Sequence, residues 1–299
     1  MLDLHRLRLL RELKHRGTLA AVAKALSYSP SAISQHLSRL ESEAGVRLLE
    51  PVGRGVRLTP QADILVAHAE AVLERLEQAQ ASIALSLADI TGTLRVAAFQ
   101  TAALSLIPPT LSRLAELHPM LRVEVTEMEP EESLPRLVAR RFDLVLGEEY
   151  PGHPQFRPPE LEQEDLIGDP MRLARPVGGP NAAPGELREL AATPWVLEPE
   201  GTAARHWAVA LCRDAGFEPE VRFQSTDLLL HVRLVETGHA AAFLPDLVWL
   251  DRAPPDHLLP LPGAPVRRIF TAVRRGAGQQ PAVRALRDIL PLSVELRGR

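Results

Sequence analysis

The sequence predicts an α/β protein built from a helical N-terminal head, one long helix and a larger α/β body. Apolar residues recur at helical spacing through the first sixty positions, a heptad repeat follows Thr59-Pro60, and strand and helix patterns alternate from Gly92 onward. These patterns place the head at residues 1–59, the long helix at 60–90 and the body at 91–299.

Composition and charge narrow the class of protein. Of the 299 residues, 45% are hydrophobic and 24% are charged, which is typical of a soluble globular chain. The start, "MLDLHRLRLLRELKHRG", is charged throughout, unlike a secretory signal, and no run of about 18 apolar residues could span a membrane. We therefore expect a cytoplasmic protein. The single cysteine, Cys212, excludes an intrachain disulfide and a redox switch built on one.

The charge is unevenly distributed along the chain. Residues 1–60 contain ten Lys/Arg and five Asp/Glu, a difference of +5, so residues 61–299 must carry −9 to give the formal net charge of −4. A basic head on an acidic body predicts that the head alone contacts a polyanion.

The head is predicted to contain three helices followed by a β-ribbon. The first helix should end at Gly17 and the third at Gly45, because glycine readily adopts the left-handed conformation after a helix. Ser29 can cap the third helix, and Pro30 suits its first position. Residues 46–60, "VRLLEPVGRGVRLTP", predict two short strands around a Gly-Arg-Gly turn. This order of elements predicts a winged helix-turn-helix.

The third helix separates apolar from polar residues. At about 100° per residue, Ile33, Leu37 and Leu40 share one stripe, and a continuous polar face lies opposite. Short hydroxyl side chains let a helix approach a flat partner closely, and serine and glutamine hydrogen-bond to phosphates and base edges. On a lone helix this face would be simply solvated. Its place in the basic, winged segment instead favours contact with double-stranded DNA.

The residues expected to contact DNA come from this helix and from the wing. The base or phosphate contacts are expected from short polar residues, and the arginines are expected mainly to supply phosphate affinity and its salt dependence. The positive helix N-terminus at Ser29-Pro30 is expected to point at a phosphate. The full set is Ser29, Pro30, Ser31, Ser34, Gln35, Ser38 and Arg39 from the helix, and Arg54 and Arg57 from the wing.

The long helix begins at Thr59-Pro60, with threonine as the cap and proline at the first helical position. Its apolar residues alternate by four and three, which is the spacing of a heptad seam. Such a seam either packs on the chain's own domain or joins two copies of the chain. We favour dimerisation, because no apolar neighbour follows before Gly92. The seam consists of Leu65, Ala69, Val72, Leu76, Ala79 and Ile83.

The body is predicted to form two α/β lobes with a cleft between them. Lobe 1 is expected at about 91–167 and 265–299, and lobe 2 at about 168–264. Residues 151–185 are rich in proline and glycine and are expected to interrupt the regular pattern. Strands are expected in "LRVAAF", "LRVEVTEM", "FDLVLG", "WVLEPEG", "EVRFQS", "AAAFLP" and "RRIFTAVRRG", with helices between them and at the C-terminus.

The stretch "GTLAAVAKALSYSPSAISQHLSRLESEAGVRLLEPVGRGVRLTPQA" resembles the DNA-binding head of LysR-type transcriptional regulators, and "GTLRVAAF", "GFEP" and "FLP" follow in the family's order. The resemblance implies a linker helix and a regulatory domain similar to periplasmic binding proteins. It also implies dimers or tetramers on interrupted dyad promoter sites, and a small-molecule effector. The wing departs from the family's "LFER": this chain has Leu49, Glu50 and Pro51, so one arginine that could contact phosphate is missing.

Effector contacts are expected where strand ends and helix N-termini of both lobes face the cleft. The candidates are Phe99, Gln100, Thr101 and Glu148 from lobe 1, and Gly201, Thr202 and Thr226 from lobe 2. Helix N-termini with hydroxyl groups favour a carboxylate, although each hydroxyl residue could equally be an ordinary N-cap. Glu148 and Glu149 could bind the amino group of a zwitterion such as an amino acid, or be solvated acids at a hinge.

Other classes of function find less support in the sequence. A ligand-binding or enzymatic α/β domain whose head serves only assembly is the main alternative, and a transport-type binding protein would need a signal segment. The histidines His206, His231 and His239 lack metal-ligand spacing. No phosphate-binding loop, nucleophile elbow or dinucleotide glycine pattern occurs, so we expect no cofactor, no metal and no enzymatic activity.

Overall fold

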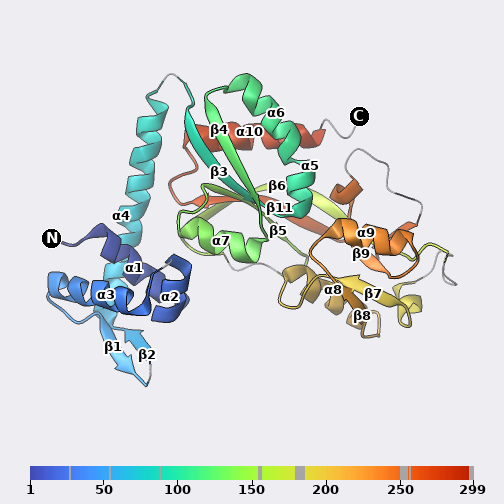
Figure 1. Cartoon of the computed structure of the whole chain (residues 1–299), viewed down its shortest axis with the longest axis horizontal. Helices are drawn as coiled ribbons and strands as arrows, with labels where there is room; N and C mark the ends of the chain where they lie inside the picture. The colour runs from blue at the N-terminus through green and yellow to red at the C-terminus, as the bar shows by residue number, and fades with distance from the viewer. Residues whose placement is uncertain are drawn as a thin grey trace.

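A computed structural model describes residues 1–26, 28–53, 55–87, 89–153, 157–178, 186–249, 255 and 257–295, with residues 293–295 described by their backbone alone. The head lies at one end of a long helix, α4, and the body lies beside that helix (Figure 1). Among the described residues, no helix is both long and apolar enough to cross a membrane.

The head has the predicted helix–helix–helix–ribbon order. It contains α1 (Leu4–Arg16), α2 (Leu19–Leu26), α3 (Pro30–Ala44) and the antiparallel strands β1 (Leu49–Val52) and β2 (Gly55–Leu58). The Ser29 hydroxyl caps α3 by accepting a hydrogen bond from the Ala32 amide at 3.2 Å. Gly17 and Gly45 end their helices in the left-handed conformation, with φ of 75° and 69°. These caps confirm the predicted boundaries.

Helix α4 (Pro60–Leu85) begins as predicted, with the Thr59 hydroxyl accepting from the Ala62 amide at 3.2 Å. The face that it buries within the chain is not the predicted seam. Of the six seam residues only Ala69 is buried, whereas Val72, Leu76 and Ile83 are 47%, 37% and 67% exposed. The buried face consists of Ala62, Val66, Ala69, Leu73, Glu77 and Ala81. The predicted seam therefore stays largely open in the single chain.

The body is organised around a seven-stranded sheet with the order β10-β6-β11-β5-β3-β4, and β9 pairs with β6 beyond this path. Parallel β3, β4 and β5 form the lobe 1 end of the sheet, and β6 and β11 run antiparallel to each other. The strands are β3 (Gly92–Ala98), β4 (Leu121–Glu127), β5 (Leu144–Glu149), β6 (Leu161–Ala174), β9 (Ala242–Pro245), β10 (Leu258–Pro260) and β11 (Val266–Arg274). Strands β7 (Pro194–Leu197) and β8 (Glu220–Gln224) form a separate parallel pair in lobe 2.

The prediction that residues 151–185 are irregular is wrong for their middle. Residues 161–174 form β6, which at 14 residues is the longest strand described. Its first part pairs with β11, and its last residues pair with β9 and β10 of lobe 2. The strand therefore runs from one lobe into the other.

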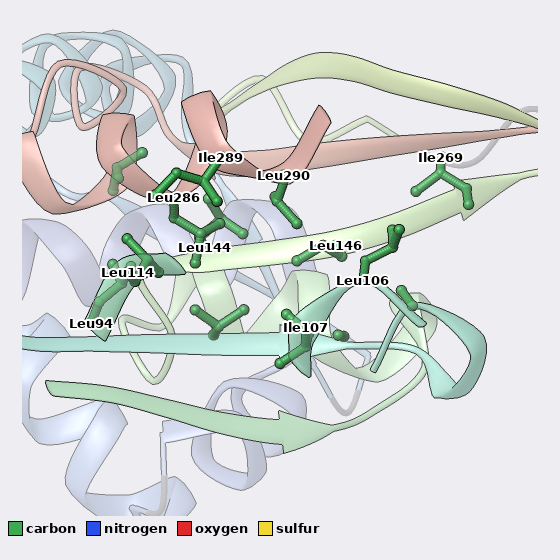
Figure 2. Packing of buried hydrophobic residues seen from close by; sticks show 14 of the residues in the cluster. Leu94, Leu106, Ile107, Leu114, Leu144, Leu146, Ile269, Leu286, Ile289 and Leu290 are labelled. Carbon is green, nitrogen blue, oxygen red and sulfur yellow. The ribbon is translucent and has the colours of Figure 1, made fainter. Parts of the chain in front are cut away.

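Helices cover both lobes (Figure 1). They are α5 (Gln100–Ser105), α6 (Ile107–Leu117), α7 (Pro130–Val138), α8 (Ala203–Asp214), α9 (Leu228–Glu236) and α10 (Pro281–Glu295), with 3-10 turns at Leu187–Leu190 and Asp246–Trp249. Figure 2 shows the lobe 1 core, in which side chains of β3 and β5 meet those of α6 and α10. Its labelled members are Leu94, Leu106, Ile107, Leu114, Leu144, Leu146, Ile269, Leu286, Ile289 and Leu290.

Helix α4 is joined to the body by a buried ion-pair network. The Glu77 carboxylate is 2% exposed and accepts from Arg274 at 2.8 Å and from Arg140 at 2.6 Å. The guanidinium of Arg274 also donates to Asp143 and to the backbone carbonyl oxygens of two lobe 1 residues. Because a buried carboxylate needs such partners, these contacts fix the side of α4 that faces the body.

Candidate DNA interface and effector cleft

The exposed face of α3 carries the polar residues that the sequence assigns to DNA. Ile33, Leu37 and Leu40 are almost completely buried, which confirms the apolar stripe. The predicted contact residues on the opposite side are all exposed: Ser29, Pro30, Ser31, Ser34, Gln35, Ser38 and Arg39. The Ser29 hydroxyl is already engaged as the helix cap and lies 3.0 Å from the Ser31 hydroxyl. Ser29 therefore starts the helix as predicted, and it lies on the exposed face together with Pro30 and the residues from Ser31 onward.

The wing is braced against α3 by a contact that was not among those predicted from the sequence. Glu41 near the end of α3 accepts hydrogen bonds from the backbone amides of Leu48 and Leu49, at 2.8 and 3.0 Å. The Thr59 hydroxyl donates to the Arg47 carbonyl at 3.0 Å. A carboxylate at the end of the third helix, just before Gly45 and the ribbon, is the sequence signal for such a brace. The wing is held at a fixed angle to the exposed face.

Of the two wing arginines, the structure describes Arg57. Arg57 is exposed and forms an ion pair with Glu50 across the ribbon at 3.0 Å. A DNA phosphate would have to compete with this carboxylate, which is a weak competitor because the pair is solvent-exposed. Arg54 lies outside the described residues.

Direct hydrogen bonds close the region between the two lobes. The Gln100 side chain of lobe 1 donates to Asp227 at 2.5 Å and accepts from the Leu228 amide at 2.7 Å, both in lobe 2. Asp227 is also the N-cap of α9, accepting from the Leu229 amide at 2.9 Å. Gln100 thus joins the two lobes, whereas its predicted neighbour Thr226 is exposed.

Arg267 of β11 is the buried centre of a polar network that contacts several of the predicted effector residues, and it is not among the residues predicted from the sequence. Its guanidinium is 1% exposed and donates to Asp169 at 2.9 and 2.7 Å and to the Thr101 hydroxyl at 2.7 Å. It also donates to Glu148 and lies 5.2 Å from the centre of the Phe99 ring. Three of the predicted effector residues are therefore held by one arginine. The alternation of β11, which puts Arg267 on the same face as buried Ile269, is the signal that could have found it.

Carboxyl groups outnumber cations around Arg267. Burial, followed by the carboxylates of Glu148 and Glu131, raises the pKa of Glu129 to about 8. Burial and the nearby carboxylate of Glu148 also raise the pKa of Glu198 well above its ordinary value. The cluster consists of Glu129, Glu131, Glu148, Asp169 and Glu198. Such crowding makes a neutral or cation-paired state of these groups favourable.

The two adjacent acids of β5 are not solvated hinge residues. Glu148 and Glu149 are 5% and 8% exposed, and the Tyr150 hydroxyl donates to Glu148 at 3.2 Å. Glu149 pairs with Arg157 at 3.0 Å and with Arg268. Glu149 is therefore satisfied away from the cleft, and Glu148 alone faces Arg267.

The N-terminus of α8 forms the lobe 2 wall next to this cluster. The Thr202 hydroxyl accepts from the Arg205 amide and donates to the Pro199 carbonyl, both at 3.1 Å, so it is an N-cap. The Glu131 carboxylate accepts from the Ala203 amide at 3.1 Å and thus bridges the lobes. Gly201 lines a cavity of about 510 Å³ that is bounded by α7, by this turn and by the last turn of α1.

Comparison with known proteins identifies the family. Residues 4–63 match the family described as bacterial regulatory helix-turn-helix protein, lysR family, and residues 88–291 match the LysR substrate binding domain. A probable hydrogen peroxide-inducible genes activator of Streptomyces viridosporus is 31% identical over 86% of this chain and 83% of its own. A protein with the same description from Mycobacterium avium is 29% identical, over 91% of this chain and 88% of that protein.

Solved structures share the fold. A full-length OxyR variant from Pseudomonas aeruginosa gives a TM-score of 0.63 at 20% identity, covering 98% of this chain and 95% of that one. Full-length CbnR in complex with its target DNA gives a TM-score of 0.53 at 24% identity, covering 98% of this chain and 100% of that one. With family matches over both the head and the body, the chain belongs to the LysR-type family of DNA-binding transcription regulators.

Proposed function

We propose that the effector of this regulator is a small molecule with a protonated amine, with amino acids as the first class to test. The observation that carries this proposal is the excess of carboxyl groups around Arg267, of which Glu148, Asp169 and Glu198 are buried. An ammonium group placed among them would pair with carboxylates that now repel one another, and it would favour their ionised form. An anion alone would add to this repulsion.

The lobe 2 wall offers a place for the carboxylate of an amino acid. The Glu131 carboxylate now occupies the N-terminus of α8 through the Ala203 amide. A ligand carboxylate could take over this hydrogen bond, since amides at a helix N-terminus favour anions. The displaced Glu131 would then turn toward the ligand's ammonium group. The Gln100–Asp227 hydrogen bond also joins the lobes, so a ligand that moves the lobes relative to each other would strain or lengthen it.

Isothermal titration of the full-length protein tests this effector class. The panel contains the common amino acids, diamines, and the carboxylic acids that lack the amino group but are otherwise matched. We expect heat from at least one amine and none from the matched acids. No heat with any amine, or equal binding of the matched acid, would refute the proposal.

A peroxide effector is not supported by the cysteine content of this chain. Cys212 of α8 is buried, and burial raises the pKa of its thiol to about 12. The reactive thiolate is therefore scarce at neutral pH. The activity named for the peroxide-inducible relatives is thus not proposed for this chain.

We propose that the exposed face of α3 reads the DNA, with Gln35 as the main base contact. Replacing Gln35 by alanine is expected to weaken binding to the DNA next to the protein's own gene by about 5- to 150-fold, as loss of a good base contact costs about 1–3 kcal/mol. The measurement is a gel shift with competitor DNA at fixed salt.

Gln61→Ala, at an exposed glutamine in the first turns of α4, is the matched control and should bind as the natural chain does. Arg39→Ala should instead reduce the salt dependence of binding, since it removes a phosphate contact. Specific binding that is unchanged in Gln35→Ala would favour the alternative in which the head serves only assembly.

We propose that the open seam of α4 joins two copies of the chain. Val72, Leu76 and Ile83 are too exposed for apolar residues aligned on one helix face, and a partner helix would cover them. Val72→Glu with Leu76→Glu is expected to convert the protein to monomers in sedimentation velocity. The control is Leu117→Glu, at an exposed leucine that ends α6. A dimer that persists in the double variant would place the interface elsewhere.

The division into domains follows the same proposal. We propose the head at 1–59, the linker and dimerisation helix at 60–90 and the regulatory domain at 91–299, with lobe 1 at about 91–167 and 265–299. Lobe 2 then spans about 168–264. The relatives are transcription regulators, which supports a role in binding rather than catalysis. A regulator that must reach chromosomal DNA is inferred to act in the cytoplasm.

A further inference from the structure

Three side chains with metal-binding atoms meet where the head, α4 and the body come together. His15 lies in the last turn of α1, Glu70 lies on α4, and Glu160 directly precedes β6. The His15 Nε2 atom is 3.3 Å from Glu70 Oε1 and 2.5 Å from Glu160 Oε1. One ligand atom from each residue lies within 4.8 Å of both others. The cluster uses none of the candidate effector or DNA-contact residues, although His15 and Glu160 line the same cavity of about 510 Å³ as Gly201 and Ala203.

Glu160 is the most buried member of the cluster, and His15 is its ion-pair partner. Its side chain is 8% exposed, and apart from the close contact with His15 neither carboxylate oxygen has a hydrogen-bond partner among the described residues. Its backbone carbonyl accepts from the Arg275 amide at 2.7 Å, so the residue is held in place. Because this buried carboxylate depends on His15 alone, a cation that replaces the imidazole proton between the two residues would satisfy both of them.

We propose that His15, Glu70 and Glu160 bind a first-row divalent cation, with Zn²⁺ as the best match. One imidazole nitrogen and two carboxylate oxygens are zinc ligands at about 2.0–2.2 Å, and a tetrahedral site places its ligand atoms about 3.3 Å apart. The His15–Glu70 spacing of 3.3 Å matches this value, and the His15–Glu160 spacing of 2.5 Å must widen by a side-chain movement as an ion enters. The two carboxylates neutralise the ion, and water takes the fourth position.

The site is accessible and would couple parts of the protein. His15 and Glu160 line the cavity of about 510 Å³, while Glu70 and Glu160 line a second cavity of about 390 Å³, so an ion can enter from either side. An ion bound here joins the head to α4 and to β6, the strand that runs into both lobes. Its occupancy would therefore restrain the head against the regulatory domain.

The test is a titration of chelator-treated full-length protein with ZnCl₂ in competition with a chromophoric chelator. We expect one Zn²⁺ per chain, bound at least about tenfold more weakly in His15→Ala and in Glu160→Gln. Glu70→Gln is a second variant for the case in which a buried substitution unfolds the chain, since this side chain is 33% exposed. Circular dichroism shows which variants remain folded.

Two matched substitutions serve as controls. Glu74→Gln changes a glutamate one turn further along α4, and His118→Ala changes a histidine at the end of α6. Both are expected to bind Zn²⁺ as the natural chain does. Absence of a bound equivalent, or equal affinity in the natural chain and in folded Glu70→Gln, would overturn the proposal.

Discussion

Arg267→Leu is expected to destabilise the protein by at least about 3–5 kcal/mol, because it leaves buried carboxylates without their partner. The guanidinium holds Glu148 and Asp169, which are 5% and 4% exposed, and the Thr101 hydroxyl. Since a domain's total stability is about 5–15 kcal/mol, a loss of this size approaches unfolding. The measurement is the free energy of unfolding in urea.

Arg213→Leu is the control for this prediction. Arg213 pairs with Glu218 at 2.7 Å on the exposed surface, where solvent screens the interaction. Its replacement is expected to change stability little. An Arg267→Leu variant as stable as this control would show that the carboxyl groups do not depend on Arg267.

Glu129→Gln is expected to make the protein more stable at high pH and to leave it nearly unchanged at pH 5. The folded-state pKa of Glu129 is about 8, above its ordinary value of 4.5. The folded state therefore holds a proton that the unfolded state releases, and stability falls as the pH rises from about 5 to 8. The pKa difference corresponds to a loss of up to roughly 5 kcal/mol in the free energy of unfolding by about pH 8.

Urea unfolding of both proteins at intervals from pH 5 to pH 9 measures this effect. The amide of the variant stays neutral, so the difference in unfolding free energy between variant and natural chain should grow with pH and level off above about pH 8. Glu116→Gln, at an exposed glutamate of α6, should show no such growth. If the unfolding free energies of Glu129→Gln and the natural chain changed in parallel with pH, Glu129 would not be the source of the pH dependence.

The head could be predicted from the sequence because its structure is set by neighbours in the chain. The cap at Ser29, the glycine at position 45 and the stripe of Ile33 and Leu37 all act within one helix. Local rules of capping and periodicity therefore suffice. The wing brace by Glu41 escaped them, because it depends on how the ribbon folds back onto α3.

The body was predicted less completely because its central features are long-range. Residues 161–174 contain acidic residues, Gly168 and Pro170, so they do not look like a strand until β11 pairs with them. Arg267 meets Thr101 across 166 positions, and no local pattern announces that contact. The candidate residues Gln100, Thr101 and Glu148 follow from where strands end, whereas the surplus of carboxyl groups needed the tertiary structure.

The central claim is that an amine in the cleft changes how α3 binds DNA. The direct measurement is the dissociation constant for the DNA next to the protein's own gene, determined by fluorescence anisotropy as the amine found by calorimetry is added. We predict a shift of several-fold in the natural chain, with about tenfold more amine needed in Glu129→Gln, as expected for loss of one charge-assisted contact. A dissociation constant unmoved by the bound amine, or moved equally in both proteins, would contradict the account.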